Sequence, residues 1–170
     1  MDSLPSVHLP GEKLGSGDIA NTPSTDGQKV WYKTFLAQAL GVAAIRGGHT
    51  VLFTRLDAIF KDLAQARVDH SLERAFRRYL TPDILIVDDF GLHCLSAMQS
   101  NDLYELIIER HRRSSFVITS NRSVDEWLGL FDDPILGNSA LDRLCYGAYQ
   151  IVIEGPSYRA KKAPKVLDQN

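Results

Sequence analysis

The sequence has few cysteines and no long apolar run. Cys94 and Cys145 are the only cysteines, and they lie far apart and outside any CxxC spacing. This arrangement argues against a disulfide framework and a thiolate zinc site, and it favours a reducing cytosol. No apolar run approaches the roughly 20 residues of a membrane span, and the N-terminus lacks the charged-then-apolar order of a signal peptide. We therefore expect a soluble, cytoplasmic protein with no membrane partner.

The sequence also lacks a large excess of either charge. It carries 19 Lys and Arg against 21 Asp and Glu, a net charge of -2, so contact with nucleic acid would have to come from local basic patches. One basic group could bind DNA phosphates, although such arginines more often form a solvated helix face. The group consists of Arg67, Arg74, Arg77 and Arg78. A second group ends a predicted helix, where positive charge complements the helix dipole; it consists of Arg110, Arg112 and Arg113.

Composition divides the 170 residues into an arm, a core and a tail. Residues 1–28 are rich in Pro, Gly and small polar residues and have no apolar face, which predicts a poorly ordered arm. Residues 29–155 carry the periodic apolar pattern of a single core. Residues 156–170, with three lysines, are expected to form a mobile basic tail.

Within the core, predicted strands alternate with predicted helices. Apolar spacing predicts helices over 33–46, 56–63, 72–79, 99–112, 123–130 and 138–145. Short apolar runs predict strands over 50–54, 84–89, 116–119 and 149–153. This alternation is typical of an α/β domain with a largely parallel sheet.

The most informative segment is Ile84–Asp89, in which four apolar residues run into two aspartates. Such a run predicts a strand buried on both faces of a parallel sheet, and ligands bind at the C-terminal end of such strands. One carboxylate can hold the Mg²⁺ that bridges phosphates, and the next can orient an attacking water. The pair suits a nucleotide site, although an Asp-Asp turn after a buried strand is also ordinary architecture.

The segment Gly27–Thr34 has the spacing GxxxxGKT of a phosphate-binding loop, with one defect. Such a loop needs glycines so that backbone amides can close round the anion, followed by Lys and Ser or Thr at a helix N-terminus. Tyr32 stands in the place of the second glycine, where its Cβ and ring occupy space that the β-phosphate would approach. Lys33 and Thr34 occupy the last two positions of the motif, so its cation and its hydroxyl are still present. The alternative is that Lys29–Tyr32 forms a short strand and that the loop cradles nothing.

From Thr34 to about Arg159 the order of motifs resembles an IstB-like ATP-binding protein, the AAA+ ATPase helper of an insertion-sequence transposase, related to DnaA and DnaC. The resemblance implies a three-layer P-loop NTPase (AAA+) core, with ATP and Mg²⁺ as cofactors. It also implies double-stranded DNA, a transposase and further copies of the chain as partners. Residues 1–32 match neither the helical N-terminal region nor the first strand and glycine loop of the family, so we expect the first strand to be missing or replaced.

The resemblance also implies a role for each site residue. Lys33 and Thr34, with Gly27, would bind the nucleotide, and Thr34 and Asp88 would coordinate Mg²⁺. Asp89 would polarise water. Asn121, in a segment that resembles sensor 1, would hold that water near the γ-phosphate, although it could simply satisfy a turn. Arg143, in a segment that resembles the arginine finger, would reach the nucleotide of a neighbouring subunit, although it could simply pair with Asp142.

Two functions remain open on the sequence. The first is an ATP-binding helper of transposition whose nucleotide binding and hydrolysis are impaired by the defective loop. The second is a non-catalytic remnant that acts as a DNA- or protein-interaction module.

Overall fold

A computed structural model describes residues 33–153 of the chain. The predicted arm, Gly27, Tyr32 and the predicted basic tail lie outside the described residues. The elements are, in order, α1 (Lys33–Arg46), β1 (Val51–Arg55), α2 (Leu56–Val68), α3 (Leu72–Leu80), β2 (Ile84–Phe90), α4 (Ala97–Arg110), β3 (Ser115–Ser120), the 3₁₀ turns η2 (Val124–Glu126) and η3 (Leu128–Leu130), and α5 (Pro134–Cys145). None of the helices within 33–153 is long and apolar enough to span a bilayer.

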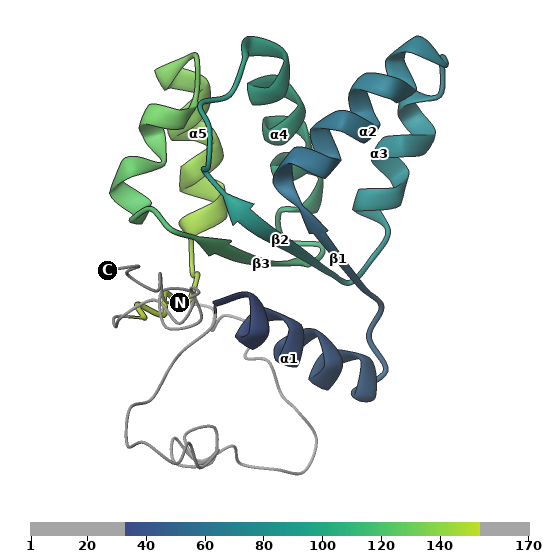
Figure 1. Cartoon of the computed structure of the whole chain (residues 1–170), viewed down its shortest axis with the longest axis vertical. Coiled ribbons are helices and arrows are strands. Elements are labelled where there is room, and N and C mark those ends of the chain that lie inside the picture. Colours follow the sequence, from purple (N-terminus) through teal and green to yellow (C-terminus); the bar gives the residue numbers. More distant parts are fainter. Residues whose placement is uncertain (1–32, 154–170) are drawn as a thin grey trace, which may run out of the picture.

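The three strands form a parallel sheet in the order β1-β2-β3. Of the helices within residues 33–153, α1 lies on one face of this sheet, and α2, α3, α4 and α5 cover the other (Figure 1). The structure therefore has the three layers and the parallel sheet that the sequence predicts. Because all strands run the same way, their C-terminal ends meet at one edge, next to the start of α1.

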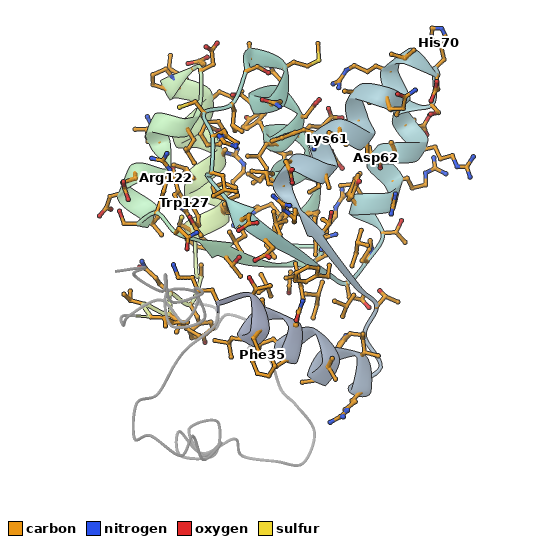
Figure 2. All side chains as sticks on the ribbon, in the orientation of Figure 1. Phe35, Lys61, Asp62, His70, Arg122 and Trp127 are labelled. Carbon is orange, nitrogen blue, oxygen red and sulfur yellow. The ribbon has the colours of Figure 1, made fainter. Side chains whose placement is uncertain are left out.

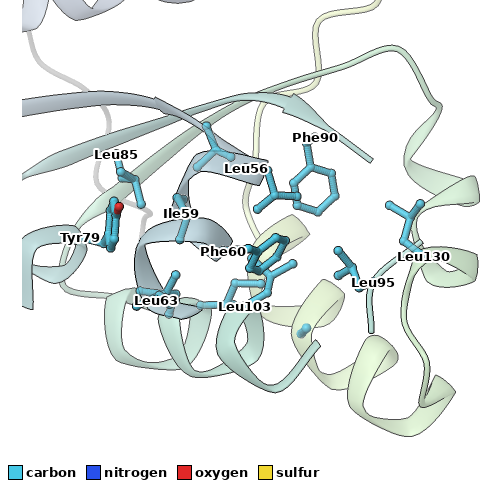
Figure 3. Close-up of a cluster of buried hydrophobic side chains, with 14 of the residues drawn as sticks. Leu56, Ile59, Phe60, Leu63, Tyr79, Leu85, Phe90, Leu95, Leu103 and Leu130 are labelled. Atoms are coloured by element: carbon cyan, nitrogen blue, oxygen red, sulfur yellow. The ribbon is translucent and has the colours of Figure 1, made fainter. Parts of the chain in front are cut away.

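The central strand β2 is buried on both faces, as its apolar run predicts. Leu85 and Val87 belong to the main hydrophobic cluster between the sheet and α2, α4 and α5 (Figure 3). Ile86 faces the opposite way, towards α1. A Cβ on Gly41 would lie 2.8 Å from Ile86 Cδ1, so the absence of a side chain at this position lets α1 pack closely on the sheet.

The prediction of a strand at Tyr149–Ile153 is wrong. These residues have no strand structure, and Tyr149, Ile151 and Val152 have between 67% and 88% of their surface exposed. A strand needs a neighbour for its backbone hydrogen bonds. Within residues 33–153 no strand pairs with the outer edge of β3.

Arg110 has a different role from the predicted complement to a helix dipole. Its side chain is only 1% exposed, and its guanidinium donates hydrogen bonds to the carbonyl oxygens of Tyr79 (2.7 Å), Pro82 (2.9 Å) and Ser115 (2.8 Å). Burial lowers the pKa of Arg110 to about 10. The residue therefore joins the end of α3 to the starts of β2 and β3, at the edge of the sheet opposite the site.

Candidate nucleotide-binding site

Four of the predicted site residues, from three distant parts of the chain, meet at the C-terminal edge of the sheet. Thr34 Oγ1, in the first turn of α1, donates to the carboxylate of Asp88 with both O···O distances at 3.1 Å. Lys33 Nζ donates to the carbonyl oxygen of Ser120 at 2.6 Å and to Asn121 Oδ1 at 3.2 Å. The start of α1 thus faces the ends of β2 and β3, so that a cation, a threonine hydroxyl, an amide side chain and a carboxylate lie around one edge of the sheet.

Asp88 is the buried acid of the site, with 6% of its surface exposed. Its carboxylate accepts from the hydroxyls of Thr34 and Thr119. No basic side chain within residues 33–153 forms an ion pair with it. A buried carboxylate held only by neutral donors is poorly compensated, and its oxygens beside a threonine hydroxyl are the ligand types that Mg²⁺ prefers. The residues present therefore fit a magnesium ion.

No group of three His, Cys, Asp or Glu side chains in the described part of the chain could hold a metal by itself. A magnesium ion at Asp88 would take its remaining ligands from water and from phosphate oxygens, which is how this ion is usually bound in nucleotide sites. The donor set thus points to a metal that arrives together with a phosphate.

The second aspartate, Asp89, faces a different set of neighbours. Its Oδ2 lies 3.2 Å from Arg55 Nε, and the same nitrogen lies 3.4 Å from Asp57 Oδ1. Asp89 also lines a cavity of about 270 Å³ together with Phe60 and Cys94. In this conformation the carboxylate that the sequence assigns to water polarisation is paired with the end of β1.

The loop after β3 is fixed by Ser120, which the sequence reasoning did not single out. Ser120 Oγ donates to the carbonyl oxygen of Phe90 at 2.8 Å and accepts from the backbone N–H of Arg122 at 3.0 Å and from Trp127 Nε1 at 3.3 Å. Arg122 Nε donates to the carbonyl oxygen of Gly91 at 2.5 Å, and Arg122 and Trp127 both come from the segment that follows β3 (Figure 2). These bonds tie the chain on either side of Asn121 to the turn after β2.

Arg143 is not part of this cluster. It lies in the last turn of α5, where its guanidinium donates to the carbonyl oxygen and the hydroxyl of Ser139 at 2.7 and 2.6 Å. No ion pair between Arg143 and Asp142 is formed. Gly27, the remaining predicted site residue, lies outside the described residues.

The basic group on α2 and α3 is largely neutralised by local acids. Arg67 pairs with the buried Asp102 on α4. Arg77 pairs with Glu73 at 2.6 Å, and Arg78 lies 3.4 Å from Asp62. Most of the cations that the sequence offers to DNA phosphates are therefore already paired within the domain.

Two solved structures have a similar fold. The DnaC helicase loader aligns with a TM-score of 0.54 at 23% identity, covering 66% of this chain and 67% of its own. AMPPCP-bound DnaA from Aquifex aeolicus aligns with a TM-score of 0.55 at 18% identity, covering 63% of this chain and 34% of its own. At these identities the likeness shows the fold alone, which is the α/β core of AAA+ P-loop NTPases.

Sequence comparison then gives the family. The profile of the family described as IstB-like ATP binding protein matches residues 26–166. An insertion-sequence ATP-binding protein of Mycobacterium tuberculosis is 42% identical over 133 residues, which are 78% of this chain and 53% of that protein. The IS21 ATP-binding protein of Pseudomonas aeruginosa is 35% identical over 140 residues, 81% of this chain and 53% of that protein. The chain belongs to the IstB-like ATP-binding protein family, and it spans about half the length of these relatives.

Proposed function

We propose that this chain binds ATP together with Mg²⁺ at the edge formed by the start of α1 and the ends of β2 and β3, and that it acts as an AAA+ helper domain in insertion-sequence transposition. The observation that carries the proposal is the contact of Thr34 with Asp88 beside the contact of Lys33 with Asn121. An ammonium, a hydroxyl and a buried carboxylate at a helix N-terminus are the groups that a metal–phosphate ligand needs.

Each of these groups has a defined task in the proposal. Lys33 exchanges its bonds to Ser120 and Asn121 for bonds to phosphate oxygens, because its ammonium has three donors and a flexible stem. Thr34 and Asp88 hold the metal, which supplies charge neutralisation on the phosphates when it is bound. Asn121 then has its side-chain amide free to orient water near the terminal phosphate.

Hydrolysis by this chain is proposed to be weak or absent, for two reasons. Tyr32 replaces the second glycine of the phosphate-binding loop, so the backbone cannot close fully round the anion. Asp89, the group proposed to polarise water, is paired with Arg55, and the pair must open before the carboxylate can accept a proton from water. Because the same loop would cradle the phosphates, nucleotide binding is proposed to be impaired as well as hydrolysis.

Isothermal titration of the full chain with ATP tests the proposal, in the presence of Mg²⁺ and in the presence of EDTA. We expect weak binding that Mg²⁺ strengthens and that is lost in Lys33→Ala, whereas micromolar binding by the wild type would show that the loop works despite Tyr32. Lys61→Ala is the matched control, because Lys61 is an exposed lysine paired with Asp57 at 3.5 Å, and this variant should bind as the wild type does. Absence of binding by the wild type, or equal binding by Lys33→Ala, would refute the proposed site.

A Tyr32→Gly variant separates the two causes of weak activity. If Tyr32 is the main defect, the glycine should tighten ATP binding and raise the hydrolysis rate. No gain in either quantity would place the fault elsewhere, for example in a first strand that does not support the loop.

We propose DNA, a transposase and further copies of this chain as partners, with Arg143 reaching the nucleotide of a neighbouring copy. Support comes from the insertion-sequence relatives and from the hydrogen bonds of Arg143, which within residues 33–153 go to Ser139 and not to Lys33, Thr34, Asp88 or Asn121. Binding of double-stranded DNA, measured with and without ATP·Mg²⁺, should depend on the nucleotide, and sedimentation should show ATP-dependent assembly. Nucleotide-independent DNA binding would favour the alternative, a non-catalytic interaction module.

A further inference from the structure

The two aspartates of the site lie in a break in the pairing of β2 with β3. Val87 pairs with Ile118 and Phe90 pairs with Ser120, so that Asp88 and Asp89 together lie opposite the single residue Thr119. Two residues opposite one define a β-bulge, and bulges are rare between parallel strands. The bulge falls on the only acidic residues of the strand.

This bulge changes the face of the sheet on which the side chain of Phe90 lies. Side chains alternate between the faces of a regular strand, so residue 90 would share a face with residues 86 and 88. With the extra residue, Phe90 instead enters the cluster that contains Leu85 and Val87, while Asp88 stays on the α1 side and contacts Thr34. At the bulge, Asp89 has a left-handed backbone conformation, with a φ of 58°. This conformation costs of order 1 kcal/mol or more for a residue other than glycine.

A single hydroxyl satisfies both residues of the bulge. Thr119 Oγ1 accepts from the backbone N–H of Asp89 at 3.3 Å and donates to Asp88 Oδ1. The first bond replaces the ladder partner that the bulge removes from Asp89. The second fixes the orientation of a carboxylate that is 6% exposed. Both oxygens of Asp88 are therefore set by threonines, Thr34 from α1 and Thr119 from β3.

We propose that Thr119 is the positioning residue of the metal site: its hydroxyl holds the bulge in β2 and thereby presents Asp88 to Mg²⁺ in a fixed orientation. The part that concerns Mg²⁺ depends on the proposed function, whereas control of the bulge does not. Thr119 itself need not touch the nucleotide or the metal, because it acts through Asp88 and through the backbone of Asp89.

The test compares the full-length wild type with Thr119→Val, which keeps the shape and removes the hydroxyl, and with Thr119→Ser, which keeps the hydroxyl. Thr54→Val is the matched control, since Thr54 is the last residue but one of the neighbouring strand β1 and, among residues 33–153, its hydroxyl donates only to the adjacent Arg55 carbonyl oxygen, at 3.4 Å. Hydrogen exchange of the Asp89 amide measures the bulge directly. Titration with ATP, in Mg²⁺ and in EDTA, measures the increase in affinity that the metal provides.

In Thr119→Val we expect exchange of the Asp89 amide to accelerate at least tenfold, about the effect of losing one hydrogen bond. We also expect the increase in ATP affinity due to Mg²⁺ to fall about tenfold, because a bond to a charged group is lost, with affinity in EDTA unchanged. Thr119→Ser and Thr54→Val should stay close to the wild type in both measurements. A general loss of structure would lower the affinity in EDTA as well, so it would not mimic this result.

Three outcomes would overturn the proposal. Unchanged Asp89 exchange in Thr119→Val would show that the hydroxyl does not hold the bulge. Faster exchange with an unchanged effect of Mg²⁺ would show that the bulge does not position the metal ligand, as would failure of Thr119→Ser to restore that effect. If the wild type binds no ATP, the proposed function fails by itself, the inference loses its metal-site part, and the exchange of the Asp89 amide alone decides whether Thr119 holds the bulge.

Discussion

Replacement of Arg110 by methionine should destabilise the fold far more than its position at the end of a helix suggests. The three hydrogen bonds from its guanidinium to carbonyl oxygens are 2.7 to 2.9 Å long. Each bond from a charged donor contributes about 1.5–3 kcal/mol. Burial of the cation offsets part of this gain: a pKa lowered from 12.5 to about 10 corresponds to roughly 3 kcal/mol. We therefore expect Arg110→Met to lose about 2–5 kcal/mol of the free energy of unfolding, with the methionine chain keeping much of the packing.

Equilibrium unfolding in urea measures this loss as a lower midpoint at an unchanged slope. Arg113→Met is the control, because Arg113 has 77% of its side chain exposed and pairs only with Glu109 at 3.3 Å; its loss should stay below about 0.5 kcal/mol. A loss of less than about 1 kcal/mol in Arg110→Met would refute this prediction. It would mean that water hydrogen-bonds to the carbonyl oxygens that lose Arg110, or that the cost of burying the cation equals the gain from its three hydrogen bonds.

Three further perturbations have defined outcomes. Arg67→Met leaves the Asp102 carboxylate, whose side chain is 5% exposed, buried without its cation, and should cost about 3–5 kcal/mol in urea unfolding; the double variant Arg67→Met/Asp102→Leu should recover most of that loss. Gly41→Val places a branched side chain where even a Cβ has only 2.8 Å to its nearest neighbour; thermal unfolding should show a loss of about 1–3 kcal/mol, and a neutral result would mean that α1 can move away from the sheet. The hydrogen bonds from Thr50 hold the pKa of Asp83 below its ordinary value, so its folded form binds a proton less readily than the unfolded chain. The stability it contributes is present above the ordinary pKa of an aspartate and is lost as the pH falls towards the lowered value; Asp83→Asn should therefore flatten the acid limb of stability against pH, and an unchanged limb would contradict the assignment.

Much of the core could be predicted from the sequence because the signals are local. The apolar run Ile84–Val87 has no polar residue and gives a strand buried on both faces. The Gly47-Gly48 pair follows the end of α1, and Gly48 has a φ of 86°, a conformation that glycine adopts freely. The meeting of Lys33 and Thr34 with the ends of β2 and β3 was implied by the family resemblance, whereas the residues alone left open whether the loop before them cradles anything.

The features that the sequence did not reveal depend on tertiary pairing. The bulge at Asp88 and Asp89 exists only in relation to Thr119 on another strand, and no local pattern marks it. Arg110 looks like any basic residue in a last helical turn, because the carbonyl oxygens it serves come from three other segments. The run Tyr149–Ile153 has the composition of a strand, but composition cannot supply the neighbour that such a strand requires.

Strand β3 carries Thr119 and Ser120 and leads directly into Asn121, yet within residues 33–153 it is paired only with β2. Local opening of β3 has a free energy of its own, because it would break the hydrogen bonds that Lys33 donates to Ser120 and Asn121. Contacts from a phosphate ligand through Lys33 and Asn121 would add to that free energy. Occupancy of the site and order of the strand that forms it are thereby thermodynamically linked, and each increases with the other.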